Sequence, residues 1–352
     1  MNSRKVLAAA FLILLVGLFL RGPSQAADWK YSSFLPPAHW ANYCNSWLLD
    51  EIEKRTKGEI KITMYAAEAL GKAPEHYSMV TTGRVEMAEF TAGFAPGILP
   101  LCSVLQMPFT WSESLKGSIV ANELLRKGYL DETLTRDVKV ISLNLTETLK
   151  IWTTKPVQTL AELKGLQLRV SGGLDAKAVE ALGAVPIMMP LPEMYPALSK
   201  GVISGVVTGI STGMDFKLHE ATKYIMDVPA SIAVHMHIMN KKLWNSLSLN
   251  TQQILEQIFR ENETHWSVTI DTLESRARAV VRERFGVNVY EPPASEVEKI
   301  RNATKGVTDE WIAEMEKKGL PGRKTYEAML ESMRNNGIIL DQTWVTNRAV
   351  KK

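Results

Sequence analysis

The sequence predicts a two-lobed α/β protein built on a largely parallel sheet. Strand-like runs alternate with helix-like segments from Trp29 onward, and the same alternation begins again after Lys155. An amphipathic pattern free of proline and glycine then runs from about Thr251 to Phe285. Strands that alternate with helices are typical of α/β units, because each helix packs on a face of the sheet. We therefore expect two lobes and one helix long enough to brace both.

The first residues have the pattern of a secretory signal peptide. Arg4 and Lys5 precede an unbroken apolar run at residues 6–20, and small residues follow it. This run is shorter than the roughly 20 residues that cross a bilayer, so a retained membrane anchor is the less favoured alternative. We expect residues 1–26 to be removed by cleavage near Ala26 or Ala27.

The first half of the mature chain alternates strands and helices. In order, we expect a strand at WKYSSF, a helix from about Trp40 to Thr56, a strand at EIKITMY, a helix from Pro74 to Thr82, a strand at VEMAEFT and a strand at Val138–Leu145. Gly58 and Gly83 follow the two helices, as is typical of helix C-termini, where glycine adopts a left-handed conformation without strain.

The second half repeats this organisation. In order, we expect the strand LQLRV, the helix DAKAVEALG, a loop at Pro186–Pro192, the helix EMYPALSKG, and the strands VISGVVTG and YIMDVPASIAVHMHIMN. Amphipathic helices follow the long helix, in EVEKIRNATKGVTDEWIAEMEKKG and at Tyr326–Asn335.

The helical pattern from Thr251 to Phe285 is unusually long. At 1.5 Å per residue it corresponds to about 50 Å, the width of a two-lobed protein. The alternative is two shorter helices broken near the polar ENETH segment.

These patterns divide the mature chain between two lobes. We expect residues 27–148 in the first lobe and residues 149–232 in the second. Residues 233–270 then return to the first lobe with the start of the long helix. Residues 271–352 carry the rest of that helix and the C-terminal helices, which we assign to the second lobe.

Composition excludes some functions and leaves one question open. The 41 basic and 38 acidic residues give a net charge of +3, and three basic residues lie in the leader, so the mature protein is close to neutral. Without a long basic tract we expect no nucleic-acid partner. Cys44 and Cys102, the only cysteines, can form a disulfide in an oxidising compartment but need not do so.

Motifs for catalysis, cofactors or metals find little support. The chain has no G-x-S-x-G elbow, no zinc-type Cys and His spacing and no dinucleotide glycine pattern, so we expect no catalytic residue, cofactor or metal. One alternative stays open, because His235 and His237 share a face of a predicted strand and, with Met239, form part of a soft-metal site. Solvent-facing histidines are the ordinary interpretation of this pattern.

Arg169 is the most informative single residue. It lies in the apolar strand LQLRV, where a guanidinium group must reach solvent or find an anion, because it stays charged and carries five donors. A carboxylate ligand would satisfy it, and a structural salt bridge is the alternative. Aromatic residues near predicted strand ends are candidates for lining a cleft, since ligands bind at the carboxyl ends of strands in α/β sheets, and core packing competes with this interpretation. These aromatic residues are Phe34, Trp40, Phe90, Phe94 and Trp152.

Taken together, the segments resemble the periplasmic substrate-binding proteins of tripartite ATP-independent periplasmic (TRAP) transporters. The likeness spans essentially the whole mature chain and is most specific in ELKGLQLRV followed by EMYPALSKG. It includes EIEKRTKGEIKITMY, TTGRVEMA, the pair Pro108-Phe109, EALGAVPIMMP and NKKLWNSL.

The resemblance implies two lobes joined by crossing hinge strands, with the long helix behind both and a ligand between them. It implies that Arg169 forms a bidentate pair with a ligand carboxylate. It also implies a periplasmic receptor, not an enzyme, that delivers a small organic acid to the membrane subunits of a TRAP permease driven by an ion gradient. We expect the receptor to be a monomer.

Departures from the family pattern favour a small monocarboxylate with an apolar or aromatic body. Family members that bind polyhydroxylated acids carry a second Arg where this chain has Leu149, and a polar amide, an aromatic residue and an acid are replaced by Thr208, Leu191 and Thr91. Each change removes charge or hydrogen-bonding capacity and would leave sugar hydroxyls unsatisfied. The expected site comprises Phe34, His39, Trp40, Phe90, Thr91, Phe94, Leu149, Trp152, Arg169, Met189, Leu191 and Thr208.

Two alternative functions stay open. Within the family, the ligand could be a C4-dicarboxylate or a 2-oxo acid, with Lys150 or His39 as the partner of a second carboxylate. Outside it, the chain could be a periplasmic metal-binding or sensor protein that uses His235 and His237.

Overall fold

The computed structural model describes residues 27–94 and 97–338. The predicted leader at residues 1–26 lies outside the described residues, as do residues 95–96 and 339–352. Among the described helices, none combines the length and the apolar character that crossing a membrane requires.

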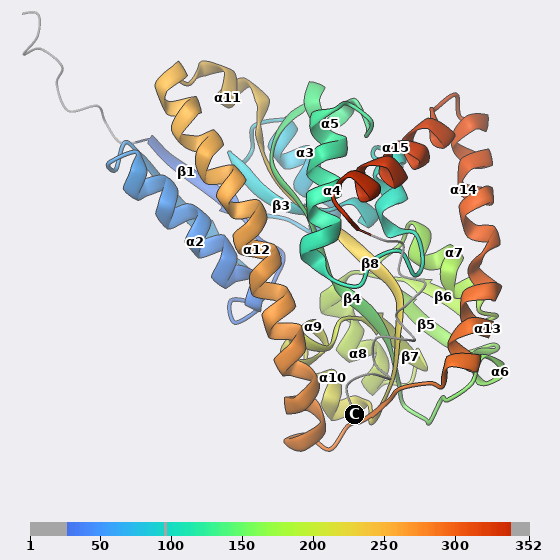
Figure 1. Cartoon of the computed structure of the whole chain (residues 1–352). Coiled ribbons are helices and arrows are strands. Elements are labelled where there is room, and N and C mark those ends of the chain that lie inside the picture. Colours follow the sequence, from blue (N-terminus) through green and yellow to red (C-terminus); the bar gives the residue numbers. More distant parts are fainter. Residues whose placement is uncertain (1–26, 95–96, 339–352) are drawn as a thin grey trace, which may run out of the picture.

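One mixed sheet of nine strands runs through the described part of the chain (Figure 1). The strand order is β2-β1-β3-β8-β4-β7-β5-β6, and β9 pairs with β8. Parallel pairing holds β1 to β2 and β3 at one end, and β5 to β6 and β7 at the other. The strands are β1 (Ala27–Ser32), β2 (Ile60–Tyr65), β3 (Met87–Thr91), β4 (Val138–Thr153), β5 (Gln167–Val170), β6 (Val185–Met188), β7 (Gly205–Thr208), β8 (Tyr224–Asn240) and β9 (Asn288–Tyr290).

The long antiparallel strands β4 and β8 connect the two parallel groups, and they are the crossing strands that the resemblance implied. We call the part of the molecule built around β1, β2 and β3 the first half, and the part built around β5, β6 and β7 the second half. β8 pairs with β3 of the first half, and β4 pairs with β7 of the second. The expected strand at Val138–Leu145 is only the beginning of β4, which continues to Thr153. The apolar pattern stops at Leu145 because Thr146 and Glu147 interrupt it. Both of these residues line the cavity described below. At this point the pairing of β4 with β8 is irregular, between Leu145 and Thr148, and the strand continues beyond it.

Helices cover both faces of the sheet (Figure 1). Most of the longer helices follow the predicted pattern. Helices α4, α5, α6, α9, α10 and α11 were not predicted, and β6 occupies part of the segment that we expected to be a loop. The 3-10 helices are η1 (Ala73–Glu75), η2 (Ala92–Phe94), η3 (Leu101–Gln106) and η4 (Leu191–Glu193). The α-helices are α2 (Trp40–Arg55), α3 (His76–Thr81), α4 (Ser114–Arg126), α5 (Thr133–Arg136), α6 (Leu160–Leu163), α7 (Leu174–Ala181), α8 (Met194–Ser199), α9 (Ile210–Asp215), α10 (Leu218–Ala221), α11 (Lys241–Ser246), α12 (Leu249–Glu283), α13 (Ala294–Thr304), α14 (Gly306–Lys317) and α15 (Gly322–Asn335).

Helix α12 is one unbroken helix of 35 residues, so the alternative of two helices broken near ENETH is wrong. It runs along both halves of the molecule, from beside α2 to beside α9 and α10 (Figure 1). The carboxylate of Asp271 accepts the first two backbone N–H groups of α4, at 2.8 and 3.0 Å. Within the same turn of α12, Glu274 accepts the first two N–H groups of α9, at 3.0 and 2.9 Å. Because carboxylates stabilise helix N-termini, one turn of α12 holds a helix from each half.

The C-terminal helices pack differently from our assignment of residues 271–352. Helix α13 contributes Ile300 to the second-half core, but α14 and α15 join the first-half core around α4 and η3. Trp311 Nε1 donates to Ser103 Oγ at 2.7 Å, and Thr325 Oγ1 donates to the carbonyl of Tyr129 at 3.0 Å. Amphipathic spacing predicts which face of a helix is buried but not its neighbour, because either lobe offers an apolar surface.

The two cysteines are not paired. Cys44 and Cys102 are both free and buried, and they belong to separate apolar clusters. Burial raises the pKa of the Cys44 thiol to about 12, so this group is a neutral thiol that packs as a small apolar side chain.

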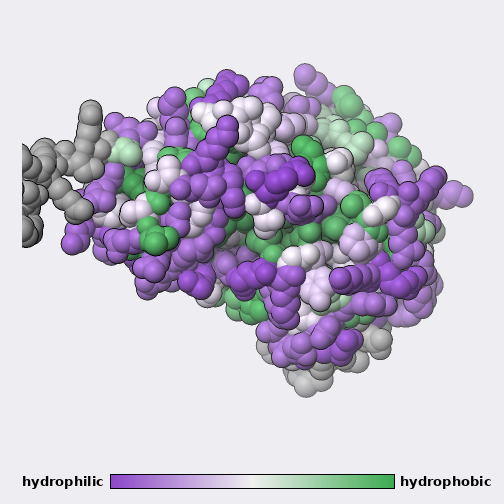
Figure 2. All heavy atoms as spheres, turned by 90° about the horizontal axis from the view of Figure 1, so that it is seen from above, coloured by the Kyte–Doolittle hydropathy of each residue, from purple (hydrophilic) through white to green (hydrophobic). Residues whose placement is uncertain are grey.

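Polar side chains cover most of the face shown in Figure 2, and apolar residues form small areas between them. The large apolar side chains with high exposure in the described residues, such as Tyr43, Met188 and Leu249, belong to different elements. Scattered exposure of this kind is ordinary for a folded domain.

Gly205 in β7 lies between β4 and β5, where it pairs with Thr153 and Leu168. We predict that Gly205→Ala destabilises the fold. A Cβ atom there would lie 2.3 Å from the backbone oxygen of Trp152 and 2.9 Å from Leu168 Cδ2. Relieving this overlap requires β4 and β7 to separate, and we expect a loss of about 1–3 kcal/mol in chemical denaturation. Gly97→Ala is the matched control, because a Cβ atom at Gly97 would meet no other atom within 4 Å. Equal stabilities of the two variants would contradict the prediction.

Candidate functional site

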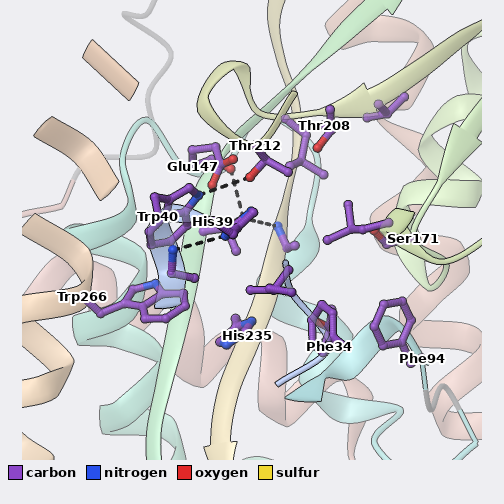
Figure 3. A pocket seen from close by; sticks show the side chains of 18 residues that line it. Phe34, His39, Trp40, Phe94, Glu147, Ser171, Thr208, Thr212, His235 and Trp266 are labelled. Carbon is purple, nitrogen blue, oxygen red and sulfur yellow. Dashed lines mark hydrogen bonds between the residues drawn. The ribbon is translucent and has the colours of Figure 1, made fainter. Parts of the chain in front are cut away.

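A cavity lies between the two halves (Figure 3). Residues from α2, β3 and η2 of the first half and from β4, β7 and α9 of the second line it, together with residues of β8 and α12. The predicted site residues that line the cavity are Phe34, His39, Trp40, Thr91, Phe94, Leu149, Leu191 and Thr208.

Aromatic rings form much of the cavity wall. Phe34 and Phe94 meet edge to face, with ring centroids 5.7 Å apart. Trp40 meets Trp266 of α12 edge to face at 4.8 Å, and His235 stacks on Trp266 at 4.5 Å. Edge-to-face and offset contacts fix ring positions, so the wall is a preformed apolar surface.

The remaining predicted residues do not line the cavity. Phe90 precedes Thr91 in β3 and therefore points to the opposite face, where it packs on Tyr77 with ring centroids 5.6 Å apart. Trp152 is fully buried in the second-half core, and a Cβ on Gly213 would lie 2.4 Å from its indole ring. The side chain of Met189 packs in the same core.

Arg169 is fully buried in β5, adjacent to the cavity rather than in its lining. Its Nε donates to the carbonyl of Met189 at 2.9 Å, whereas Nη1 and Nη2 have no hydrogen-bond partner among the described residues. Ser171, which follows the C-terminal end of β5, does line the cavity. Burial lowers the pKa of Arg169 to about 10, and the charges of Asp175 and Glu193 partly oppose this shift. The guanidinium group is therefore charged at neutral pH and two of its nitrogens lack acceptors.

Contacts across the cavity join the two halves. The backbone N–H of Trp40 donates to Asp215 Oδ2 at 3.0 Å, and its indole Nε1 donates to Thr212 Oγ1 at 3.3 Å. Gly172, with φ of +115°, approaches Gly93 so closely that a Cβ atom would lie 2.8 Å from the Gly93 carbonyl oxygen. Only glycine combines this conformation with this approach, so the loop after β5 is shaped to meet the first half.

Glu147 is a cavity residue that the sequence analysis missed. Its side chain fills the space left by the missing Cβ of Gly209, since a Cβ there would lie 1.9 Å from Glu147 Cγ. Burial and the nearby charge of Glu274 raise the pKa of Glu147. Oε2 of Glu147 has no hydrogen-bond partner among the described residues, and Oε1 lies 3.5 Å from Ser211 Oγ. The sequence prediction ended the strand at Leu145, whereas β4 continues to Thr153 and carries Glu147. An acidic residue that directly follows a predicted apolar strand was the available signal.

His39 caps the N-terminus of α2. Its Nδ1 accepts the N–H of Ala41 at 3.2 Å, and burial lowers its pKa to about 3, so the neutral ring carries its proton on Nε2. This Nε2 is buried without a hydrogen-bond partner among the described residues, and Asp215 Oδ2 is 3.9 Å away.

The histidines considered as metal ligands serve other roles. Both ring nitrogens of His237 are engaged, with Ser142 Oγ at 2.9 Å and Asn45 Oδ1 at 2.8 Å. His235 lines the cavity, and Met239 is buried in a separate apolar cluster. Within the described residues, no group of three or more His, Cys, Asp or Glu side chains is arranged to hold a metal ion.

A buried carboxyl group, Glu89, lies beneath the cavity. It accepts hydrogen bonds from Ser33 Oγ at 2.7 Å, the N–H of Phe34 at 3.0 Å and Asn45 Nδ2 at 2.8 Å. Its Oε2 is 3.7 Å from Nε2 of His235. Burial raises the pKa of Glu89 from 4.5 to about 7, although the hydrogen bonds oppose the shift.

Comparisons with known proteins agree with this architecture. The sequence pattern of the bacterial extracellular solute-binding proteins, family 7, matches residues 38–315. The sialic acid-binding periplasmic protein SiaP of Vibrio cholerae is 21% identical over 75% of this chain and 82% of that protein. A TRAP solute-binding protein of Rhodoferax ferrireducens, solved with benzoate, has a TM-score of 0.82 at 23% identity and covers 89% of this chain and 99% of its own. A marine metagenome TRAP solute-binding protein specific for aromatic acids, solved with 3-hydroxybenzoate, has a TM-score of 0.82 at 25% identity, with 88% and 99% covered.

Glu89 should make stability depend on pH. In the folded protein Glu89 keeps its proton up to about pH 7, whereas an ordinary Glu loses it near pH 4.5. Its contribution to the free energy of unfolding is therefore complete below pH 4.5 and is lost as the pH rises through 7. Relative to Glu89→Gln, the wild type should lose about 3 kcal/mol between pH 4.5 and pH 8, measured by chemical denaturation. Glu53→Gln, on the exposed surface of α2, serves as the control. Parallel pH profiles of wild type and Glu89→Gln would refute the prediction.

Proposed function

Because the chain belongs to the bacterial extracellular solute-binding proteins of family 7, the receptors of TRAP transporters, we propose that it is a periplasmic receptor for a small organic monocarboxylate. In this role it binds its ligand between the two halves and delivers it to the membrane subunits of a permease driven by an ion gradient. The protein has no catalytic role, and it uses no cofactor.

One observation carries this proposal: a fully buried guanidinium group, with two nitrogens that find no partner in the described part of the chain, lies beside the cavity between the halves. Burying a charge without a partner is costly, so the site requires an anion. A carboxylate matches the two free nitrogens of Arg169, because its two oxygens accept parallel hydrogen bonds from a guanidinium fork.

The rest of the cavity favours a single carboxylate on an aromatic or apolar body. Phe34, Phe94 and Trp266 offer ring faces and edges to such a body. Lys150, which was considered as the partner of a second carboxylate, forms an ion pair with buried Asp227 at 3.2 Å. A C4-dicarboxylate is disfavoured accordingly. The relatives solved with benzoate and 3-hydroxybenzoate bind ligands of the class that we propose.

Ligand binding would stabilise the closed arrangement because the ligand contacts both halves. Arg169 and Thr208 belong to the second half, and Phe34 and Phe94 belong to the first. A ligand held by one half alone would not shift an equilibrium between open and closed forms. The contacts of Trp40 with Asp215 and Thr212 would then form together with the ligand contacts.

We expect Arg169→Met to abolish binding of carboxylates and to raise the melting temperature of the ligand-free protein. Each hydrogen bond between charged groups contributes about 1.5–3 kcal/mol, so losing two should weaken binding at least about 100-fold. The ligand-free protein gains because an unpartnered buried charge is replaced by an apolar side chain of similar length. A thermal-shift screen of aromatic and aliphatic carboxylates, followed by calorimetry, measures both effects.

The control for Arg169→Met is Arg136→Met, which removes an exposed Arg whose Nε lies 2.6 Å from an Asp137 carboxylate oxygen. This variant should bind like the wild type. If Arg169→Met still binds carboxylates, Arg169 is not the anchor. If no carboxylate stabilises the wild type, the ligand class itself is wrong.

A further inference from the structure

Polar atoms without partners gather around the cavity. Four of the described side chains that line it each bury such an atom: His39 Nε2, Glu147 Oε2, His235 Nε2 and Trp266 Nε1. Leaving a buried donor or acceptor unpaired is costly, so such atoms mark positions where a bound molecule supplies the partner. A purely apolar ligand body would leave all four unpaired.

His39 and Glu147, which carry two of these atoms, lie at the same end of the cavity. Figure 3 shows Glu147, Thr212 and His39 at one end and Phe34 and Phe94 at the other. Thr212 lies close to both residues, because its Oγ1 accepts the indole N–H of Trp40, the residue after His39, and its hydroxyl and N–H groups act on the carboxyl group of Glu147.

Strand β7 lies between Glu147 of β4 and Arg169 of β5. Arg169 pairs with Val206, and Val206 pairs with Trp152, so Arg169 is level with Trp152, and Glu147 lies further along β4. The two backbone positions are therefore roughly 16 Å apart along the strands and about 10 Å apart across them. The long side chains of Arg169 and Glu147 and the body of a ring-containing acid would bridge this separation together.

The surroundings of the two acids determine which one holds a proton. Burial raises the pKa of Glu274, but two backbone N–H groups and the Ser211 hydroxyl, at 2.8 Å, donate to it, and the charge of Lys150 also favours its carboxylate form. Two neighbouring carboxylates disfavour double ionisation, and burial together with the charge of Glu274 raises the pKa of Glu147, although hydrogen bonds from Thr212 oppose this shift. Glu147 therefore offers an O–H donor to the cavity, and His39 offers its Nε2–H.

We propose that Glu147 and His39 form a second, uncharged polar subsite, which binds a hydroxyl group on the ligand body while Arg169 holds the carboxylate. This inference rests on the proposed function and specifies its ligand as a hydroxylated carboxylic acid. A hydroxyl group fits best because it can accept a hydrogen bond from His39 Nε2–H and can donate one to, or accept one from, the carboxyl group of Glu147. A second carboxylate does not fit, because neither group carries a positive charge.

Matched ligands test the subsite. Calorimetry compares 3- and 4-hydroxybenzoate with 3- and 4-methylbenzoate, which have nearly the same shape but cannot form the hydrogen bonds. For the wild type, at least one hydroxy acid should bind about tenfold or more tightly than its methyl counterpart. This comparison needs no variant and therefore does not depend on any variant folding.

Variants of Glu147 test whether this residue causes the preference for hydroxy acids over methyl acids. Glu147→Met, of similar length but without polar oxygens, should reduce the ratio of hydroxy to methyl affinities to about one, whereas Glu147→Gln should keep most of it. Glu132→Met, at an exposed position remote from the cavity, should leave the ratio unchanged.

The outcomes separate this inference from the proposed function. Equal affinities of the hydroxy and methyl acids for the wild type, or an unchanged ratio in Glu147→Met, would overturn the subsite and leave the carboxylate receptor intact. Failure of every one of these acids to bind the wild type would overturn the aromatic ligand class, and the subsite with it.

Discussion

Two acidic side chains in one turn of α12 hold the molecule together. Asp271 binds the N-terminus of α4 in the first half, and Glu274 binds the N-terminus of α9 in the second. Each carboxylate satisfies backbone donors that the helix itself leaves unpaired. The long helix is therefore more than a packing surface, because it fixes helices from both halves against a common frame while β4 and β8 cross between them.

The charge of Glu274 also determines the chemistry of the cavity. Burial raises the pKa of Glu147, and the neighbouring carboxylate of Glu274, which binds the N-terminus of α9, raises it further. A carboxylate that caps a helix therefore also favours the neutral form of the acid beside it. In the proposed function, this effect lets a site for an anion contain a second carboxyl group.

In and beside the cavity lie polar groups that find no partner among the described residues. They are two nitrogens of Arg169 and one atom each of His39 and Glu147. In the proposed function, a ligand that supplies partners to groups of both halves gains more free energy than one that contacts a single half. Recognition and closure would then have the same physical origin, which is the pairing of groups buried between the halves.

The sequence alone determined the α/β class, the continuous amphipathic pattern of α12 and the position of Arg169 within an apolar strand, because each depends on local periodicity or on a single charge in an apolar run. It predicted several wall residues, such as Phe34 and Leu149, from strand ends and family pattern. Only the tertiary structure decided that Phe90 and Trp152 face the cores, since one step along a strand reverses the side of the sheet. It also decided that Glu147 faces the cavity and that α14 and α15 cover the first half. These features depend on which distant segments pack together, and no local pattern encodes that choice.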